Sequence, residues 1–350
     1  ALAKRCQAGH AVAVNSATSA LHLACMALGL GPGDWLWTSP ITFVASANCA
    51  RYCGADVDFV DIDPASFNLS PIALAEKLKL AKQQNKLPKV VVAVHMCGQP
   101  CDMAAIHALS QEYGFKIIED ASHAVGASEH GVPVGRCEYS DITVLSFHPV
   151  KIITTAEGGA ALTQDQRLAQ KLINLRCHGI TRDPAMMTEP PEGDWVYQQI
   201  GLGFNYRMTD LQGALGSSQL KRLDQFIAKR RWLAHEYHQR LQDMPLRLPH
   251  ERAGCQSSWH LYVVQVEQNR KQVFDALRAR GIGVNVHYMP VYRQPYYAAM
   301  GYQPSDYPNS EAYYKGAITL PLYAGMTERQ LDAVVSAVKE VLLPVSEVVV

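Results

Sequence analysis

A lysine follows a short apolar run near the middle of the chain. The segment Ser-Phe-His-Pro-Val-Lys, residues 146–151, comes directly after a predicted buried strand. A lysine in such a turn can form a covalent Schiff base with a carbonyl compound if burial lowers the pKa of its amine. An isolated lysine is more often a solvated surface residue. Lys151 is therefore a candidate nucleophile only in combination with other residues.

A carboxylate and a histidine follow another predicted strand. Asp120 comes directly after Ile117-Ile118-Glu119, and His123 is three residues further on. A carboxylate beside a pyridine nitrogen keeps that nitrogen protonated, and a pyridinium is the electron sink that pyridoxal phosphate (PLP) requires. His123 could reach the same ring. The alternative interpretation is that Asp120 only caps a following helix.

The segment Asn-Ser-Ala-Thr-Ser-Ala-Leu, residues 15–21, joins a predicted strand to a predicted helix. Free N–H groups and the positive end of the dipole at the start of a helix attract phosphate. Ser16, Thr18 and Ser19 would serve equally well as ordinary helix caps. Capping is the favoured interpretation of this segment when it is taken alone.

The segment Gly-Phe-Asn-Tyr-Arg, residues 203–207, comes just before a long predicted helix. Asn205 and Arg207 could bind phosphate or carboxylate there. A loop asparagine and a surface arginine are the simpler interpretation of this segment by itself.

Other catalytic motifs do not match this sequence. Gly29, Gly31 and Gly33 are regularly spaced, but they follow a helix and so lack the strand that precedes a dinucleotide-binding loop. The residues His235-Glu236-Tyr237-His238 have the wrong spacing for a zinc protease. The sequence contains neither a phosphate-binding Gly-x-x-x-x-Gly-Lys loop nor a Gly-x-Ser-x-Gly turn.

The elements that must position these residues alternate between strand and helix. Predicted strands lie at 11–14, 35–38, 57–62, 90–96, 115–119, 141–147 and 159–163. Predicted helices between them lie at 19–28, 41–53 and 102–113, and a further one begins at Ser70-Pro71. This alternation predicts an α/β fold with a mainly parallel sheet flanked by helices. Ligands of such sheets bind at the carboxyl ends of the strands, where the polar residues above are found.

The pattern changes after residue 209. A long helix, either continuous or broken, is predicted over 210–241, with a charged face that we expect to be solvated (Lys221, Arg222, Lys229, Arg230, Arg231). Strands at 260–266 and 282–287 and helices at 272–280 and 328–343 complete a small α+β unit. The sequence therefore predicts a large domain, 1–215, that binds the cofactor, and a small C-terminal domain, 216–350. Residues 183–194 are predicted to form a surface loop.

Composition excludes several classes of function. The 350 residues are 48% hydrophobic and 18% charged, with 32 basic and 32 acidic side chains. This balance argues against a nucleic-acid-binding surface and a polybasic membrane anchor, and no apolar run is long enough to span a bilayer. The nine cysteines include two pairs with three intervening residues, Cys49/Cys53 and Cys97/Cys101, which do not match zinc or redox spacing. Reduced thiols in the cytoplasm and no metal site are therefore expected.

The four segments, in this order, resemble the sugar aminotransferases of the DegT/DnrJ/EryC1/StrS family over essentially the whole chain. The most specific runs are Ser-Phe-His-Pro-Val-Lys-Ile-Ile-Thr-Thr-Ala-Glu-Gly-Gly at 146–159 and Ile-Glu-Asp-Ala-Ser-His-Ala-Val-Gly at 118–126. Within the family, residues 15–21, 203–207 and 286–292 with Tyr296-Tyr297 resemble the subfamily that makes UDP-4-amino-4,6-dideoxy-N-acetyl-β-L-altrosamine for pseudaminic acid. The resemblance implies fold type I of PLP-dependent enzymes and a homodimer with shared active sites.

The resemblance also implies roles for individual residues. Lys151 matches the Schiff-base lysine, Asp120 the partner of the pyridine nitrogen, and His123 a residue near the ring oxygen. Phe43 matches the aromatic side chain that stacks on the ring. Four further residues match phosphate contacts: Thr18, Ser19, Ser146 and Asn205. Of these, Asn205 matches a contact that the neighbouring subunit donates. Three residues match positions near the sugar nucleotide: His287, Tyr288 and Arg207.

These matches imply transfer of an amino group from L-glutamate to C4 of a UDP-linked 4-keto-6-deoxy N-acetyl sugar. Dehydratase relatives carry a histidine in place of the lysine, so Lys151 favours transamination. The alternatives are a C3- or C4-aminotransferase for another nucleotide sugar and a PLP-binding regulator without turnover. A Rossmann-like oxidoreductase is disfavoured, because the glycine fingerprint is missing.

One departure from the family concerns the start of the chain. Members normally carry roughly fifty residues before the position at which this sequence begins, a length typical of a small part of a domain. That stretch usually includes a glycine-containing loop near the active site. We therefore expect an N-terminal segment to be missing from this chain.

Overall fold

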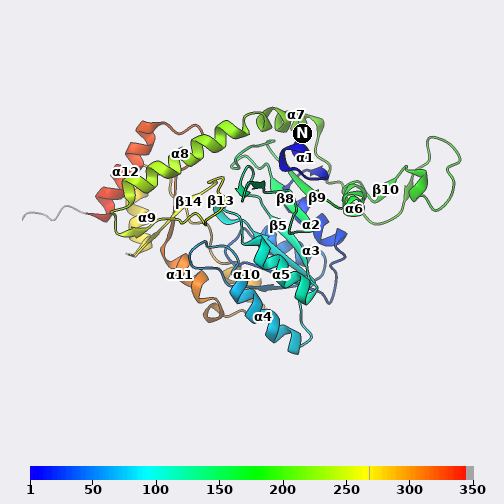
Figure 1. The fold of residues 1–350 in the computed structure, drawn as a ribbon, viewed down its shortest axis with the longest axis horizontal. Helices are drawn as coiled ribbons and strands as arrows, with labels where there is room; N and C mark the ends of the chain where they lie inside the picture. The colour runs from blue at the N-terminus through cyan, green and yellow to red at the C-terminus, as the bar shows by residue number, and fades with distance from the viewer. Residues whose placement is uncertain (268, 344–350) are drawn as a thin grey trace, which may run out of the picture.

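A seven-stranded sheet forms the centre of the N-terminal half of the molecule (Figure 1). The computed structural model describes residues 1–267 and 269–343. From β8 to β3 neighbouring strands are parallel, whereas β9 is antiparallel to both β8 and β1. The predicted mainly parallel sheet is thus confirmed. In spatial order, the strands are β1 (His10–Val14), β9 (Gly159–Thr163), β8 (Ile142–Ser146), β5 (Lys116–Asp120), β4 (Val90–Val94), β2 (Trp35–Thr38) and β3 (Asp56–Phe59).

Helices cover both faces of this sheet. One face packs against α2 (Ala17–Ala27), α3 (Ala45–Tyr52) and α6 (Gln166–Arg176), and the other against α4 (Pro71–Gln83) and α5 (Met103–Tyr113). The sequence of strand β4 is apolar throughout because both of its faces are buried. Val90 and Val92 belong to the core on the first side, whereas Val91 belongs to the core on the other. Side chains alternate along a strand, so a strand buried on both faces needs an apolar residue at every position.

Most helices begin where a capping side chain is available. Ser70 accepts a hydrogen bond from the backbone N–H of Ala73 at 3.2 Å, and Asp102 caps α5 in the same way. The predicted start of a helix at residue 41 is wrong, because α3 begins only at Ala45. The preceding residues form a turn in which the N–H of Ile41 donates to the hydroxyl of Ser39.

The C-terminal part of the chain forms a three-stranded antiparallel sheet of β12 (Leu246–Arg247), β14 (Tyr262–Val266) and β15 (Ala317–Leu320). Helices α9 (Arg270–Ala279) and α12 (Glu328–Leu342) pack against it. The strand predicted at 282–287 is wrong. Only Asn285 of this segment pairs with a strand, at Thr319. The backbone N–H of Val286 donates to the side-chain oxygen of Asn285 and not to the sheet. The ladder therefore stops after one bridge.

The long helical region is divided into α7 (Asp210–Leu220) and α8 (Leu223–Leu241), so the broken form is the one observed of the two that the sequence left open. Figure 1 shows α8 running from the large sheet towards α9 and α12. Its first turns contribute Leu223 and Ile227 to the core beneath β8 and β9, and its later turns contribute Leu233 and Leu241 to the small core. The boundary near residue 216 stays a prediction.

The prediction of a fully solvated charged face on this helix is wrong at Arg230. This side chain is 5% exposed, and its Nη1 donates to the carbonyl oxygens of Trp259, His260 and Leu322, each at 3.1 Å. Three carbonyl acceptors compensate in part for the lost hydration of the guanidinium. A run of basic residues in the sequence does not distinguish this buried arginine from its neighbours.

Residues 183–194 lie in a projecting loop between β10 (Ile180–Thr181) and β11 (Gln198–Gln199), as predicted (Figure 1). Within the described residues, no helix is both long and apolar enough to cross a membrane. The remaining short elements are α1 (Leu2–Cys6), η1 (Met96–Gly98), β6 (Ser128–Glu129), β7 (Val132–Pro133), η2 (Pro184–Met186), β13 (Cys255–Gln256), η3 (Val291–Arg293), α10 (Pro295–Ala298), η4 (Pro304–Asp306) and α11 (Pro308–Gly316).

Candidate active site

A cavity of about 350 Å³ lies at the carboxyl ends of β5 and β8, next to the start of α2 and the turn before α3. This is the edge at which parallel sheets bind ligands. Seven of the predicted site residues line it: Thr18, Phe43, Asp120, His123, Ser146, Lys151 and Tyr288. These residues are far apart in the sequence, and the sheet topology brings them together.

Lys151 lies in the loop that follows β8, and its backbone N–H donates to the carbonyl of His148. Burial lowers the pKa of its amine to about 8, although the negative charge of Asp120 opposes this shift. Roughly one amine in ten is then neutral at pH 7, far more than for a solvated lysine. The lysine is therefore able to act as a nucleophile and as a base near neutral pH.

Asp120 is the last residue of β5 and is 6% exposed. One carboxylate oxygen accepts a hydrogen bond from the hydroxyl of Ser46 at 2.6 Å, and the other accepts one from the backbone N–H of Ser122 at 3.1 Å. The Ser46 hydroxyl is itself 2.8 Å from that of Thr42. These contacts fix the orientation of the carboxylate towards the cavity.

The start of α2 forms one wall of the cavity. Ser16 caps this helix by accepting the N–H of Ser19, and the Ser19 hydroxyl donates to Asn15 at 2.6 Å. Ser19 is thus engaged within the turn, whereas Thr18 lines the cavity. A Cβ atom on Gly159 would lie 2.5 Å from the backbone nitrogen of Ala17. Glycine at this position lets β9 approach the turn that presents Thr18.

Two aromatic rings and the imidazole of His123 also line the cavity. His123 is 5% exposed, its Nε2 lies 3.3 Å from the hydroxyl of Tyr288, and its ring is 4.4 Å from that of His260. Burial, with the nearby positive charge of Lys151, lowers the pKa of His123 well below its usual value. The imidazole is therefore neutral. Phe43, which is 57% exposed, extends over the cavity with its ring 6.4 Å from that of Tyr288.

Four predicted residues do not line the cavity. Ser19 is engaged in the turn described above, and the Nδ1 of His287 lies 2.8 Å from the hydroxyl of Thr319. Burial, together with the charge of Lys151, lowers the pKa of His287 to about 4. Asn205 and Arg207 are exposed, and Arg207 donates to the sulfur of Cys177 at 3.0 Å. The predicted role of Asn205 concerns the cavity of a neighbouring subunit, so it stays a prediction.

Ser46 and His260 were not predicted from the sequence. Ser46 lies four residues after Thr42, a spacing that brings two side chains together in a helical turn, but a short hydroxyl side chain usually indicates only a cap. His260 lies in the buried segment that Arg230 holds through its carbonyl oxygen. Neither residue has a distinctive local pattern, so only the three-dimensional arrangement identifies them.

Comparison with known proteins is consistent with this cavity. The profile of the DegT/DnrJ/EryC1/StrS aminotransferase family matches residues 1–339. The chain belongs to this family. It is therefore a sugar aminotransferase that depends on PLP, and the predicted cofactor is confirmed.

Three relatives illustrate the range of the family. The Bacillus subtilis spore coat polysaccharide biosynthesis protein SpsC is 40% identical over 96% of this chain and 86% of its own length. The GDP-perosamine synthase of Caulobacter vibrioides is 36% identical over 98% of this chain and 88% of its own. The solved structure of Helicobacter pylori PseC, an aminotransferase involved in the biosynthesis of pseudoaminic acid, is 29% identical, with a TM-score of 0.88 over 97% of this chain and 88% of that one.

The residues of the cavity fit the cofactor of the family. A buried amine of lowered pKa, an oriented carboxylate and an aromatic ring are the groups that PLP requires for attachment, for protonation of its ring nitrogen and for stacking. Lys151, Asp120 and Phe43 would supply them, and Thr18 and Ser146 would bind the phosphate. The enzyme family is thus shown, whereas these individual roles stay predictions.

Proposed function

We propose that the enzyme transfers the amino group of L-glutamate to C4 of a UDP-linked 4-keto-6-deoxy N-acetyl sugar, as in pseudaminic acid biosynthesis. The observation that carries the catalytic part of this proposal is the pair formed by Lys151 and Asp120 in one cavity. The likeness to PseC, a protein of that pathway, supports the choice of sugar.

Lys151 is the residue that moves protons in this proposal. Its amine would hold the cofactor and, when freed by the amino donor, would take up and return the proton of the donor's α-carbon. The lowered pKa of Lys151 suits this exchange at neutral pH. When bound, PLP supplies a pyridinium ring that delocalises the electron pair left on the α-carbon.

Asp120 and His123 stabilise charge in this proposal but do not transfer protons. Ser46 and the Ser122 N–H hold the Asp120 carboxylate as an acceptor in the cavity, so its negative charge favours a protonated ring nitrogen. His123 is neutral and can donate one hydrogen bond while it accepts another. Tyr288 lies beside it and lines the same cavity, where it could contact the sugar.

A second candidate is amination of a GDP-linked sugar. The GDP-perosamine synthase of C. vibrioides is 36% identical over 98% of this chain, which exceeds the identity to PseC. The two candidates share the first half of the reaction and differ only in the sugar nucleotide that receives the amine.

The visible absorption of the PLP-loaded enzyme distinguishes the parts of this proposal. We expect a yellow band that bleaches when L-glutamate is added, followed by its return on addition of a UDP-linked 4-keto-6-deoxy N-acetyl sugar. A return of the band only with a GDP-linked keto sugar would favour the second candidate. A band that is insensitive to glutamate would contradict the proposed amino donor.

A homodimer with shared sites forms part of the proposal. Asn205 and Arg207 are exposed outside the cavity of their own chain, as expected for residues that serve a neighbouring one. Lys151→Ala and Asn205→Ala variants should each have low activity. Mixed after subunit exchange, they should recover up to about a quarter of wild-type activity, because half of the dimers then contain one intact site. Absence of recovery despite exchange would contradict the sharing of sites.

A further inference from the structure

Residues 257–260 bring two polar side chains from the C-terminal part of the chain against His123. The hydroxyl of Ser258 donates to the backbone carbonyl of His123 at 2.8 Å. The imidazole of His260 lies against that of His123, with 4.4 Å between the ring centres. Ser258 is fully buried and His260 is 5% exposed, and both lie behind the residues that line the cavity. His123 therefore connects these two residues to the cavity.

The backbone of this segment is held by two separate elements. The N–H of Ser258 donates to the carbonyl of Gly98 in η1 at 3.1 Å, and the N–H of His260 donates to that of Cys97 at 2.9 Å. Arg230 of α8 donates to the carbonyl oxygen of His260. Fixed at both its N–H groups and its carbonyl, the segment provides a rigid support for the side chains that contact His123.

Gly98 allows the close approach of the segments at this point. Its φ of 100° lies in the left-handed region, which glycine adopts without steric cost. A Cβ atom on Gly98 would lie 2.9 Å from the carbonyl oxygen of His123 and would also clash with the hydroxyl of Ser258. The contact between η1, the loop after β5 and residues 257–260 therefore requires glycine at this position.

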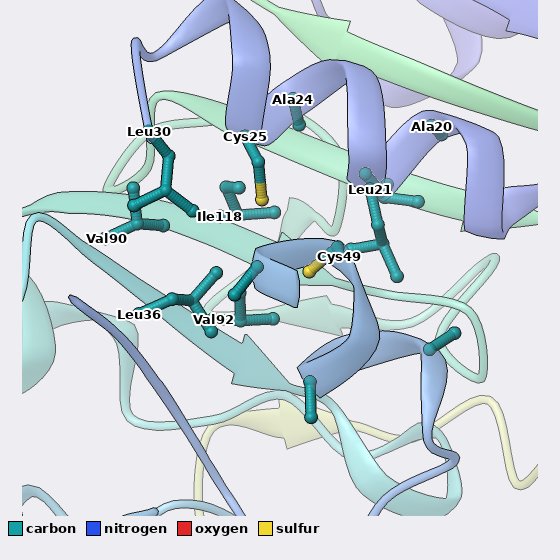
Figure 2. Close-up of a cluster of buried hydrophobic side chains, with 14 of the residues drawn as sticks. Ala20, Leu21, Ala24, Cys25, Leu30, Leu36, Cys49, Val90, Val92 and Ile118 are labelled. Atoms are coloured by element: carbon teal, nitrogen blue, oxygen red, sulfur yellow. The ribbon is translucent and has the colours of Figure 1, made fainter. Parts of the chain in front are cut away.

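Packing alone does not explain these two side chains. Apolar residues such as Val92 and Ile118 fill the core between the large sheet and helices α2 and α3 (Figure 2). Next to His123, by contrast, the buried side chains are a serine and a histidine, and burial of a polar group costs free energy unless a partner compensates. Within the part of the chain that the structure describes, the Nδ1 atoms of His123 and His260 have no hydrogen-bond partner. A polar side chain buried at such a cost indicates a role other than packing.

Both imidazoles are neutral, so they lie in contact without charge repulsion. Burial lowers the pKa of His260 well below its usual value, and the positive charges of Lys151 and Arg230 act in the same direction. Burial has the same effect on the pKa of His123. A neutral ring packed against His123 limits the rotation of its imidazole and adds no charge beside the cavity.

We propose that Ser258 and His260 are positioning residues that fix the imidazole of His123 at the cofactor. Ser258 holds the backbone of His123 through its carbonyl oxygen, and His260 restricts the orientation of its ring. This inference rests on the proposed role of His123 beside the PLP ring. It is independent of the sugar nucleotide that receives the amine.

The visible absorption band of the PLP-loaded protein measures this effect in the absence of amino donor and sugar. His123→Asn should shift the pH midpoint of the band by about half a pH unit or more, because a hydrogen-bonding group beside the cofactor is replaced. Ser258→Ala and His260→Ala should shift the midpoint in the same direction by a smaller amount. His260→Phe, which keeps a ring against His123, should shift it less than His260→Ala. A shift in His123→Asn together with a wild-type midpoint in both alanine variants would overturn the proposal.

A double variant and a stability control separate positioning from general damage to the fold. His123→Asn combined with His260→Ala should shift the midpoint no further than His123→Asn alone, because His260 acts through His123. Leu331→Ala, which opens the small core in α12, should lower the melting temperature and leave the midpoint unchanged. An additive shift in the double variant, or a shift in Leu331→Ala equal to that in His260→Ala, would overturn the positioning role. A wild-type midpoint in His123→Asn would overturn the role of His123 and this inference with it, and would leave the choice of sugar unaffected.

Discussion

Lys151 and Arg230 are both buried basic side chains, but their charges have different numbers of hydrogen-bond acceptors around them. Burial lowers the pKa of both groups, to about 8 for Lys151 and about 10 for Arg230. Arg230 donates to three backbone carbonyls, which favour the charged form of its guanidinium. Lys151 faces a cavity in which the negative charge of Asp120 opposes the effect of burial on its pKa.

The comparison shows what separates a structural buried charge from a catalytic one. Three fixed carbonyl acceptors around one nitrogen of the guanidinium stabilise the charged form of Arg230 and tie α8 to the segment that contains His260. Incomplete compensation leaves Lys151 close to the pH at which it gains or loses a proton. Hydrogen bonding therefore decides the role of each side chain more than burial does.

The largest effect is expected from Lys151→Ala. Turnover should fall by at least about a thousandfold, because the nucleophile and the base are lost together. The melting temperature should change little. Steady-state assays and thermal melts check both expectations. Lys116→Ala, at the solvent-exposed amino end of β5, is the matched control and should retain full turnover. Near-normal turnover of Lys151→Ala would contradict the assigned role.

Arg230→Met should give the opposite pattern, in which stability changes more than chemistry. Three carbonyls lose a charged donor in a buried position, so the free energy of unfolding should fall by about 3 kcal/mol. Denaturant unfolding measures this loss. Lys229→Met is the matched control on the same helix, where the amine only lies over the ring of Trp232, and it should cost less than about 1 kcal/mol. Equal destabilisation by the two variants would contradict the role given to Arg230.

Ser46→Ala tests whether the orientation of Asp120 matters. Loss of the 2.6 Å hydrogen bond should lower kcat about tenfold while the KM for the amino donor changes little, because the carboxylate stays present but is less well positioned. Ser110→Ala, which removes another buried serine hydroxyl far from the cavity, should leave kcat unchanged. A kcat of wild-type size in Ser46→Ala would show that Ser122 alone suffices.

The smallest expected effect is a shift in pH dependence. The rate at which the apoprotein captures PLP should rise about tenfold per pH unit below pH 8 and level off above it, because only the neutral amine of Lys151 reacts. Asp120 raises the pKa of Lys151, so Asp120→Asn should move this midpoint to lower pH. Stopped-flow absorbance measures both profiles. A midpoint near the ordinary lysine value would contradict the effect of burial.

The sequence was sufficient for most of the sheet and for the residues of most distinctive chemistry. Apolar runs such as residues 90–94 predict buried strands because each face needs its own apolar side chains, and Lys151 and Asp120 follow such runs directly. The family resemblance supplied Phe43, which has no local signal.

The parts that could not be predicted depend on contacts between distant segments. Arg230 is one of five basic residues in its region, and only the approach of residues 259, 260 and 322 buries it. Ser46 becomes important because β5 places Asp120 next to it. The segment 282–287 has the alternation of a strand but only one position that pairs with β15. A propensity is overridden in such cases by the tertiary environment.

Helix α8 has side chains in two hydrophobic cores, with Leu223 and Ile227 in one and Leu233 and Leu241 in the other. Loss of packing in either core therefore destabilises the same continuous helix. Heating should therefore produce one calorimetric peak whose van't Hoff and calorimetric enthalpies agree, and not two separated domain transitions. A species with an intact cofactor cavity and a melted C-terminal region should not accumulate, so cofactor loss and global unfolding should occur at the same temperature.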